Sequence, residues 1–187
     1  MSLEREILVS VDVETSGPIP GEYSLLTIGA CVVDAPELTF NCLLKPIGDG
    51  AHPEAMAVTG LSLDALRLSG LDPGEAMDSF AGWLDGLSVN GGRLVFVGLN
   101  APFDWAFINY YFHRFTGANP FGFTALDIKA FYMGATGCRW DETKSSAMAA
   151  RLRPTKTGTH DALEDALYQA ELFRLARGLV SGGSSEG

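Results

Sequence analysis

One segment near the start of the chain sets the arrangement of the rest, Ile7-Leu8-Val9-Ser10-Val11-Asp12-Val13-Glu14-Thr15. Its apolar, β-branched residues predict a strand that ends in two carboxylates, and the glycines and prolines of 15–24 predict a loop after it. Residues two apart on a strand point to the same side of a sheet, so Asp12 and Glu14 are expected to lie close together. Their repulsion would raise both pKa values, and oxygen-liganded Mg²⁺ or Mn²⁺ would relieve it. A lone Asp-x-Glu is more often a solvent-exposed strand end, so the interpretation depends on acidic residues further along.

Length and composition predict one folded domain. The chain has 187 residues, of which 47% are hydrophobic, which suits a single core and argues against disorder. We expect the domain to span 1–180, followed by a loose, small and polar tail at 181–187. No apolar run approaches the roughly 20 residues that cross a bilayer, and residues 1–6 lack the features of a secretory signal, so no membrane partner is expected.

Net charge and cysteine content limit the possible modes of nucleic-acid binding and the possible cellular compartment. The net charge of −10 argues against a protein that holds nucleic acid by bulk positive charge. It leaves open an enzyme that reaches phosphate through bound metal ions, whose charge belongs to the site. The basic residues of 139–156 either contact phosphates or form a solvated loop. Three widely spaced cysteines offer no zinc spacing and are typical of reduced thiols, which suits the cytoplasm.

The order of predicted elements indicates a mixed α/β domain with one sheet. Residues 34–36 form a short turn, so the strands on either side of it are expected to pair antiparallel. A loop is expected over 135–144. The predicted strands are 7–13, 25–33, 37–44 and 94–98, and the predicted helical segments are 53–58, 62–68, 73–87, 103–115, 126–134 (after a brief strand end), 145–152 and 159–177, the last capped by Thr159 and ended by Gly178.

Two further acidic sites follow the first. Asp104 falls in the first turn of the helix after Pro102, where a carboxylate is favoured by the helix dipole even without a function. Asp165 lies in the last helix, and His160 lies at the start of that helix. Taken singly, Asp165 is an exposed helix acid and His160 a residue satisfied by a nearby carbonyl or water. Together with Asp12 and Glu14 they form an ordered set.

These three motifs resemble those of the DEDDh 3′-to-5′ exonucleases, a family that includes the proofreading subunit of bacterial replicative polymerase, ribonuclease T and oligoribonuclease-type enzymes. The motifs are Asp12-x-Glu14-Thr15, Asn100-x₃-Asp104 and His160-x₄-Asp165, and the likeness extends from residue 7 to about residue 177. The segment Ala57-Val58-Thr59-Gly60-Leu61 also resembles the proofreading type. Leu99 departs from the pattern, because many members carry His at that position.

The resemblance implies a ribonuclease H-like fold, with a mixed central sheet flanked by helices, and a two-metal hydrolysis of phosphodiester bonds. Asp12 would bridge two Mg²⁺ or Mn²⁺ ions, Glu14 and Asp165 would complete the first metal site, and Asp104 would support the second. His160 would accept the proton of the attacking water, a role that suits histidine because an imidazole ordinarily titrates near neutral pH. The expected partner is single-stranded DNA or RNA with a free 3′ end, from which the enzyme would release 5′-mononucleotides. A homodimer or a polymerase or repair partner is also left open.

Residues beside the motifs are candidates for substrate binding. Thr15 and Ser16 either hydrogen-bond the terminal nucleotide or cap their turn. Asn100 belongs to the second motif. Phe103 and Trp105 either stack on bases or pack in the core, and the four-residue spacing to Phe107 favours packing for Phe103.

Two other functions fit the same residues. An exonuclease-like fold without activity would only bind nucleic acid or a protein, although the four carboxylates and the histidine are all present. A different metal-dependent phosphoesterase, such as an endonuclease or a nucleotide phosphatase, would use a related sheet.

Overall fold

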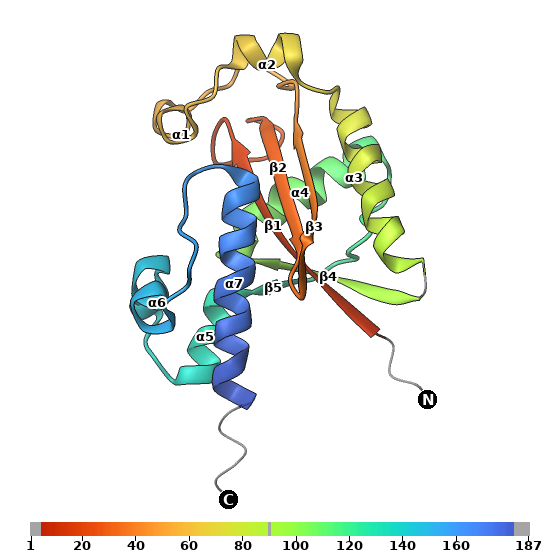
Figure 1. Ribbon diagram of the computed structural model, residues 1–187. Coiled ribbons are helices and arrows are strands. Elements are labelled where there is room, and N and C mark those ends of the chain that lie inside the picture. Colours follow the sequence, from red (N-terminus) through yellow and green to blue (C-terminus); the bar gives the residue numbers. More distant parts are fainter. Residues whose placement is uncertain (1–4, 90, 182–187) are drawn as a thin grey trace, which may run out of the picture.

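A five-stranded mixed sheet forms the centre of the molecule, with strand order β3-β2-β1-β4-β5 (Figure 1). The computed structural model describes residues 5–89 and 91–181. The central strand β1 pairs antiparallel with β2 and parallel with β4. The predicted antiparallel pairing of the second and third strands is confirmed. The strands are β1 (Arg5–Thr15), β2 (Leu25–Val32), β3 (Ala35–Leu43), β4 (Gly92–Gly98) and β5 (Ala125–Asp127).

Helices cover both faces of this sheet (Figure 1). Helices α3 and α4 pack on one face, and α5, α6 and α7 pack on the other. This arrangement confirms the predicted class, a mixed sheet flanked by helices. The helices are α1 (Pro53–Thr59), α2 (Leu63–Ser69), α3 (Pro73–Ser88), α4 (Ala101–Phe115), α5 (Ile128–Thr136), the short 3₁₀ helix η1 (Trp140–Thr143), α6 (Ser145–Leu152) and α7 (Ala162–Ser181).

Successive side chains of β1 point to opposite faces of the sheet, so its core residues lie on one face and its acidic residues on the other. Val9, Val11 and Val13 belong to the cluster beneath α3 and α4. The intervening positions face α7, where the Ser10 hydroxyl donates to the Ala166 carbonyl at 2.8 Å. Asp12 and Glu14 continue this second series because side chains alternate along a strand. The valine face therefore anchors the strand, and the opposite face presents its carboxylates toward α7.

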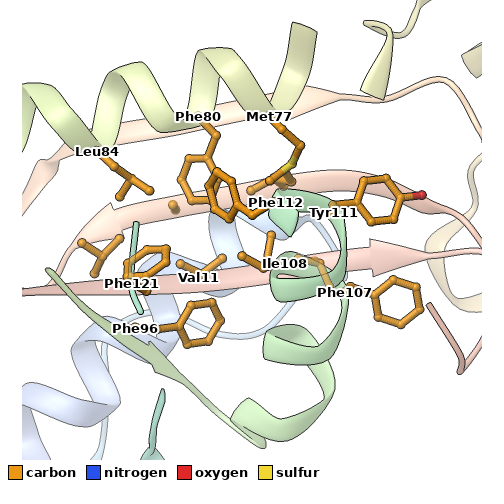
Figure 2. Close-up of a cluster of buried hydrophobic side chains, with 14 of the residues drawn as sticks. Val11, Met77, Phe80, Leu84, Phe96, Phe107, Ile108, Tyr111, Phe112 and Phe121 are labelled. Carbon is orange, nitrogen blue, oxygen red and sulfur yellow. The ribbon is translucent and has the colours of Figure 1, made fainter. Parts of the chain in front are cut away.

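Stacked aromatic rings fill the core between the sheet, α3 and α4 (Figure 2). Phe80 lies in the middle, with ring centroids 4.8 Å from Phe40 and 5.5 Å from Phe112. Tyr111 is also buried, and its hydroxyl accepts the Leu25 N–H at 2.8 Å. These contacts fix the position of α4 against the sheet, and with it the position of Asp104.

Helix α7 approaches the sheet at a glycine. Gly29 on β2 lies opposite Asp12 on β1. A Cβ atom at Gly29 would fall 2.1 Å from the carbonyl carbon of Ala162, the first residue of α7. Only a residue without a side chain allows this approach, which brings the start of α7 beside the end of β1.

The structure corrects three predicted boundaries. The last helix begins at Ala162 rather than after Thr159, because the Asp161 carboxylate accepts the N–H groups of Leu163 and Glu164, both at 3.1 Å. It continues past Gly178 to Ser181. The helix predicted over 103–115 begins at Ala101, and the loop predicted over 135–144 contains η1.

The predicted single domain over 1–180 stays a prediction, and the tail predicted over 181–187 lies outside the described residues from 182 onward. Over the described ranges, no helix combines the length and apolar character needed to cross a bilayer.

Candidate active site

Acidic side chains from three separate elements meet at one end of the sheet. Asp12 and Glu14 come from β1, Asp104 from the first turn of α4, and Asp165 from the first turn of α7. Asp104 is buried, and its Oδ1 accepts the Val13 N–H at 3.1 Å, which ties α4 to β1 between the two β1 acids. The predicted positions on strand, helix start and last helix are therefore those that the structure shows.

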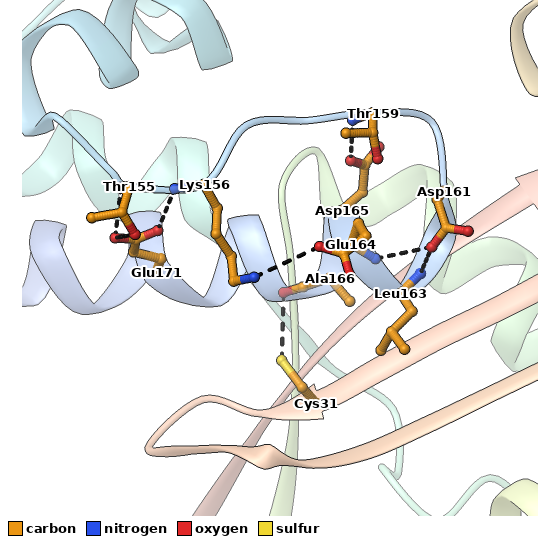
Figure 3. A network of polar contacts seen from close by, with 10 residues as sticks. All are labelled: Cys31, Thr155, Lys156, Thr159, Asp161, Leu163, Glu164, Asp165, Ala166 and Glu171. Atoms are coloured by element: carbon orange, nitrogen blue, oxygen red, sulfur yellow. Dashed lines mark hydrogen bonds and ion pairs between the residues drawn. The ribbon is translucent and has the colours of Figure 1, made fainter.

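Asp165 also organises the loop that carries His160. Its Oδ1 accepts the Thr159 N–H at 2.7 Å, and its Oδ2 accepts the His160 N–H at 3.1 Å (Figure 3 shows the first of these bonds). His160 has φ 60, in the left-handed region that a residue with a side chain rarely adopts. The carboxylate thus holds the histidine backbone in a strained conformation next to the other acids.

Three of these residues form a group that can hold a metal ion. One ligand atom from each of Glu14, His160 and Asp165 lies within 4.8 Å of the other two. Two carboxylates and an imidazole are suitable ligands for a divalent ion. A group that could hold a divalent ion is therefore present. It includes His160, which was predicted as the proton acceptor, and contains neither Asp12 nor Asp104 of the predicted ligands.

Burial and mutual repulsion disfavour the charged forms of the acids. Burial, followed by the charges of the neighbouring acids, raises the pKa of Asp12 well above its usual value. Burial and the charge of Asp165 raise the pKa of Glu14 to about 7. Burial also raises the pKa of Asp104 to about 8, although the Val13 N–H opposes the shift. A bound cation would reverse this penalty, so the electrostatics of the site suit divalent metal.

Two larger cavities adjoin the acidic group, as does a smaller one of about 130 Å³ lined by Glu14 and His160. One, of about 410 Å³, is lined by Glu14 together with Thr15, Phe103 and residues of α1 such as Val58. The other, of about 360 Å³, is lined by Asp12, His160 and Asp165, together with Ser145, Ser146 and Tyr168. Substrate thus has space on both sides of the carboxylates.

The residues predicted to bind substrate do not all reach these cavities. Thr15 lines the 410 Å³ cavity, but its hydroxyl donates to the Gly17 carbonyl at 2.9 Å. Ser16 is fully buried; its hydroxyl donates to the Gly50 carbonyl at 2.6 Å and accepts the Ser24 N–H at 2.8 Å. The hydrogen bonds of the Ser16 side chain are therefore those of the turn-capping alternative, and its contact with the nucleotide stays a prediction.

The aromatic candidates separate in the same way. Phe103 lines the 410 Å³ cavity while packing on Phe107, with ring centroids 5.4 Å apart. Trp105 instead packs edge-on against Phe96 in the core, with centroids 5.3 Å apart, so core packing is the role that the structure gives it. Asn100 is exposed at the start of α4, with φ 69.

Sequence reasoning missed two contributions to the site. His52 and Glu54, at the start of α1, line the 410 Å³ cavity, and no motif marked them. Gln169 is buried and hydrogen-bonds Asp12 directly. Its position four residues after Asp165, on the same side of the helix, is the one sequence signal that pointed toward it.

Comparison with known proteins identifies the class. A family model described as exonuclease, RNase_T, matches residues 9–173. The chain therefore belongs to the exonuclease family, and the family membership predicted from the three motifs is confirmed. It is accordingly a hydrolase of phosphodiester bonds.

Individual exonucleases are similar to this chain in sequence or in fold. The chain is 56% identical over 175 residues to the 3′-5′ DNA exonuclease Cap18 of Escherichia coli, covering 94% of each chain. The nuclease domain of 3′hExo, a DEDDh family member bound to rAMP, has a TM-score of 0.73 at 15% identity, covering 97% of this chain and 94% of that one. E. coli Exonuclease I in complex with a dT13 oligonucleotide has a TM-score of 0.72 at 17% identity, covering 92% and 41%. At these identities the two structures show the fold alone.

Proposed function

We propose that this protein removes 5′-mononucleotides from the free 3′ end of single-stranded DNA, with two divalent metal ions as cofactors. The observation that carries the proposal is the meeting of four acids and a histidine in one partly buried acidic group: Asp12 and Glu14 from β1, Asp104 from α4, Asp165 from α7, and His160 from the loop before α7. DNA, rather than RNA, is proposed because the 56% identical relative is named a DNA exonuclease.

The four carboxylates are the proposed metal ligands. We assign Asp12 to both ions, Glu14 and Asp165 to the first, and Asp104 to the second. Two ions, Mg²⁺ or Mn²⁺, would neutralise the phosphate, lower the pKa of the attacking water and support the departing 3′ oxygen. The raised pKa values of Asp12, Glu14 and Asp104 support this assignment, because they measure how poorly the protein alone accommodates the charges.

His160 is the proposed proton acceptor. Its side chain is exposed and lines the 360 Å³ cavity, so a water between it and the phosphate can be reached from solvent. Asp165 fixes its backbone through the 3.1 Å hydrogen bond, which limits the directions that the imidazole can take. An imidazole near neutral pKa accepts a proton from water and releases it to solvent.

The 410 Å³ cavity is the proposed seat of the 3′-terminal nucleotide. Phe103 offers an aromatic surface on which a base can stack, and Glu14 lines the same cavity, so the scissile phosphate would lie at the proposed metal site. Free Cys31, Cys42 and Cys138 are consistent with a cytoplasmic setting, which we also propose. A homodimer or a polymerase or repair partner stays a prediction.

Matched single-stranded DNA and RNA oligomers, labelled at the 5′ end and incubated with and without Mn²⁺, test the proposal. We expect a ladder of labelled DNA products that shorten from the 3′ end, only with metal, and slower loss of RNA. Circular single-stranded DNA should stay intact, because it has no end. Cleavage of the circle would indicate an endonuclease, and binding without shortening would indicate an inactive binding module; either result contradicts the proposal.

A further inference from the structure

Gln169 makes two hydrogen bonds inside the site. Its amide nitrogen donates to Oδ1 of Asp12, and its amide oxygen accepts the Leu99 N–H at 2.9 Å. The side chain is only 4% exposed, so neither bond is replaced by solvent. Asp12 and Gln169 both line the 360 Å³ cavity.

The two bonds fix the direction of the amide. A backbone N–H can only donate, so the oxygen of Gln169 must face Leu99 and the nitrogen must face Asp12. The reverse orientation would leave the Leu99 N–H opposite an NH₂ group in a buried site, which is costly. Gln169 therefore presents a fixed donor to one oxygen of Asp12.

This donor leaves Asp12 able to bind metal. Each carboxylate oxygen has two lone pairs, and Gln169 occupies one of those on Oδ1. The other lone pair of Oδ1 and both of Oδ2 stay available. The hydrogen bond from Gln169 restricts rotation of the Asp12 side chain, and both carboxylate oxygens remain able to bind metal.

The same amide also joins the three elements that carry the acids. It lies on α7, one turn after Asp165, and it contacts β1 through Asp12. Through Leu99 it contacts the turn between β4 and α4, five residues before Asp104. One side chain on α7 thus connects the Asp12 carboxylate on β1 with the turn that leads into α4.

We propose that Gln169 is a positioning residue for the metal site: it holds Asp12 in the orientation that binds both ions and sets the distance between the three acid-bearing elements. This inference rests on the proposed function. Hydrogen-bonding partners of metal ligands typically contribute about 10–100-fold in metal affinity or activity. Gln169 does not line the 410 Å³ cavity proposed for the 3′-terminal nucleotide, so we expect KM to change little when it is replaced.

Gln169→Met tests this role, because methionine has a similar shape and no amide. Ser10→Ala is the matched control. It removes another buried hydrogen bond between β1 and α7, two residues from Asp12, without touching any of the acids. Gln169→Asn, which withdraws the amide by one methylene, provides a second variant that keeps a polar group in place if the Met variant does not fold.

Mn²⁺ binding measured by calorimetry and by the metal-induced rise in unfolding temperature is the primary readout, with kcat and KM on a DNA oligomer as the second. We expect the Gln169 variants to bind Mn²⁺ about 10–100-fold more weakly and to lose kcat by a similar factor at unchanged KM. Ser10→Ala should lose stability in EDTA while keeping the parental Mn²⁺ affinity.

Parental Mn²⁺ affinity and kcat in a folded Gln169 variant would overturn the positioning role and leave the proposed function intact. An equal loss of Mn²⁺ affinity in Ser10→Ala would also overturn it, because the effect would then be a general loosening of α7. Failure of the parent protein to bind Mn²⁺ or to shorten DNA would instead overturn the proposed function itself.

Discussion

At the scale of single residues, the acidic site lowers the stability of the metal-free protein. Asp12, Glu14 and Asp104 have raised pKa values because burial and neighbouring charges disfavour their ionised forms. Asn100 and His160 have φ values of 69 and 60, a conformation that costs a non-glycine residue about 1–2 kcal/mol. Both belong to the predicted motifs. Such strain is typical of functional sites, where the surroundings hold it in place.

The raised pKa of Asp104 predicts a pH-dependent stability. Its pKa rises from 3.8 to about 8, so the folded state binds more protons than the unfolded state between these values. The stability that protonation confers is present below pH about 4 and is lost as the pH rises to about 8. The Asp104→Asn variant does not lose stability in this way, because its amide does not titrate. In EDTA, we expect the unfolding temperature of the variant to exceed that of the parent by an amount that grows from pH 4 to 8.

Thermal melts across this pH range check the prediction, with added Mn²⁺ as the control. Mn²⁺ should raise the unfolding temperature of the parent more than that of the variant. The difference in unfolding temperature at pH 8 should therefore become smaller. A difference that is constant from pH 4 to 8 would mean that Asp104 is not titrating as its burial requires.

A substitution at His160 distinguishes a role in proton transfer from a role in metal binding. If it accepts the proton of the attacking water, His160→Ala should lower kcat by about 10²–10⁴-fold, the usual contribution of a general base. Mn²⁺ affinity, measured by calorimetry, should change only a few-fold. His113→Ala, at an exposed position on α4, is the matched control and should keep parental activity. A large loss of Mn²⁺ affinity in His160→Ala would make His160 a metal ligand instead.

At the scale of elements, the site depends on how closely α7 approaches the sheet. The sequence was sufficient to predict the strands, most helices and the segments that carry the five motif residues, because each has a local pattern. The roles of these five residues stay predictions. The sequence was not sufficient for the start of α7, where Asp161 and Thr159 are both suitable caps and only the folded geometry selects Asp161. For Gln169 it offered only the four-residue spacing from Asp165, because the partner Leu99 lies 70 residues away and becomes a neighbour only on folding.

Gly29 is the residue that permits this approach. In Gly29→Ala the new Cβ would lie 2.1 Å from the Ala162 carbonyl carbon, so α7 must move away from β2. We expect a loss of about 1–3 kcal/mol in the free energy of unfolding, the usual cost of overpacking. Activity should fall at least tenfold, because Asp165 and His160 move with the helix.

Denaturant unfolding and the DNA assay check both effects, and Gly82→Ala is the control. Gly82 lies within α3, and a Cβ there meets no other atom within 4 Å. This substitution should stabilise the fold by about 0.5–1 kcal/mol and leave activity unchanged. Equal stability of Gly29→Ala and the parent would show that the close approach is not required.

At the scale of the whole molecule, the charge and the cavities indicate which nucleic acid fits. The net charge of −10 provides no general attraction for a long duplex. Lys156 within the basic segment 139–156 lies 3.6 Å from the Glu164 carboxylate, which compensates its charge (Figure 3). Phosphate binding would then rest on the proposed metal site and on the remaining basic residues of this segment, and the 3′ end would enter the 410 Å³ cavity as a single strand.

A paired 3′ end should consequently be degraded more slowly than a free one. Opening one base-pair step costs about 1.4 kcal/mol, which corresponds to about tenfold in rate. We expect a blunt duplex to lose its terminal nucleotide about tenfold more slowly, or slower still, than the same duplex with a single-stranded 3′ overhang. The initial rates for 5′-labelled strands measure this ratio, and equal rates would contradict the single-strand preference.

Anomalous diffraction from crystals soaked in Mn²⁺ tests the central claim most directly, which is that acids from β1, α4 and α7 form one cation site. The account predicts two manganese peaks about 4 Å apart, bounded by carboxylate oxygens of Asp12, Glu14, Asp104 and Asp165. Manganese bound only elsewhere on the molecule, with no peak among these four carboxylates, would contradict it.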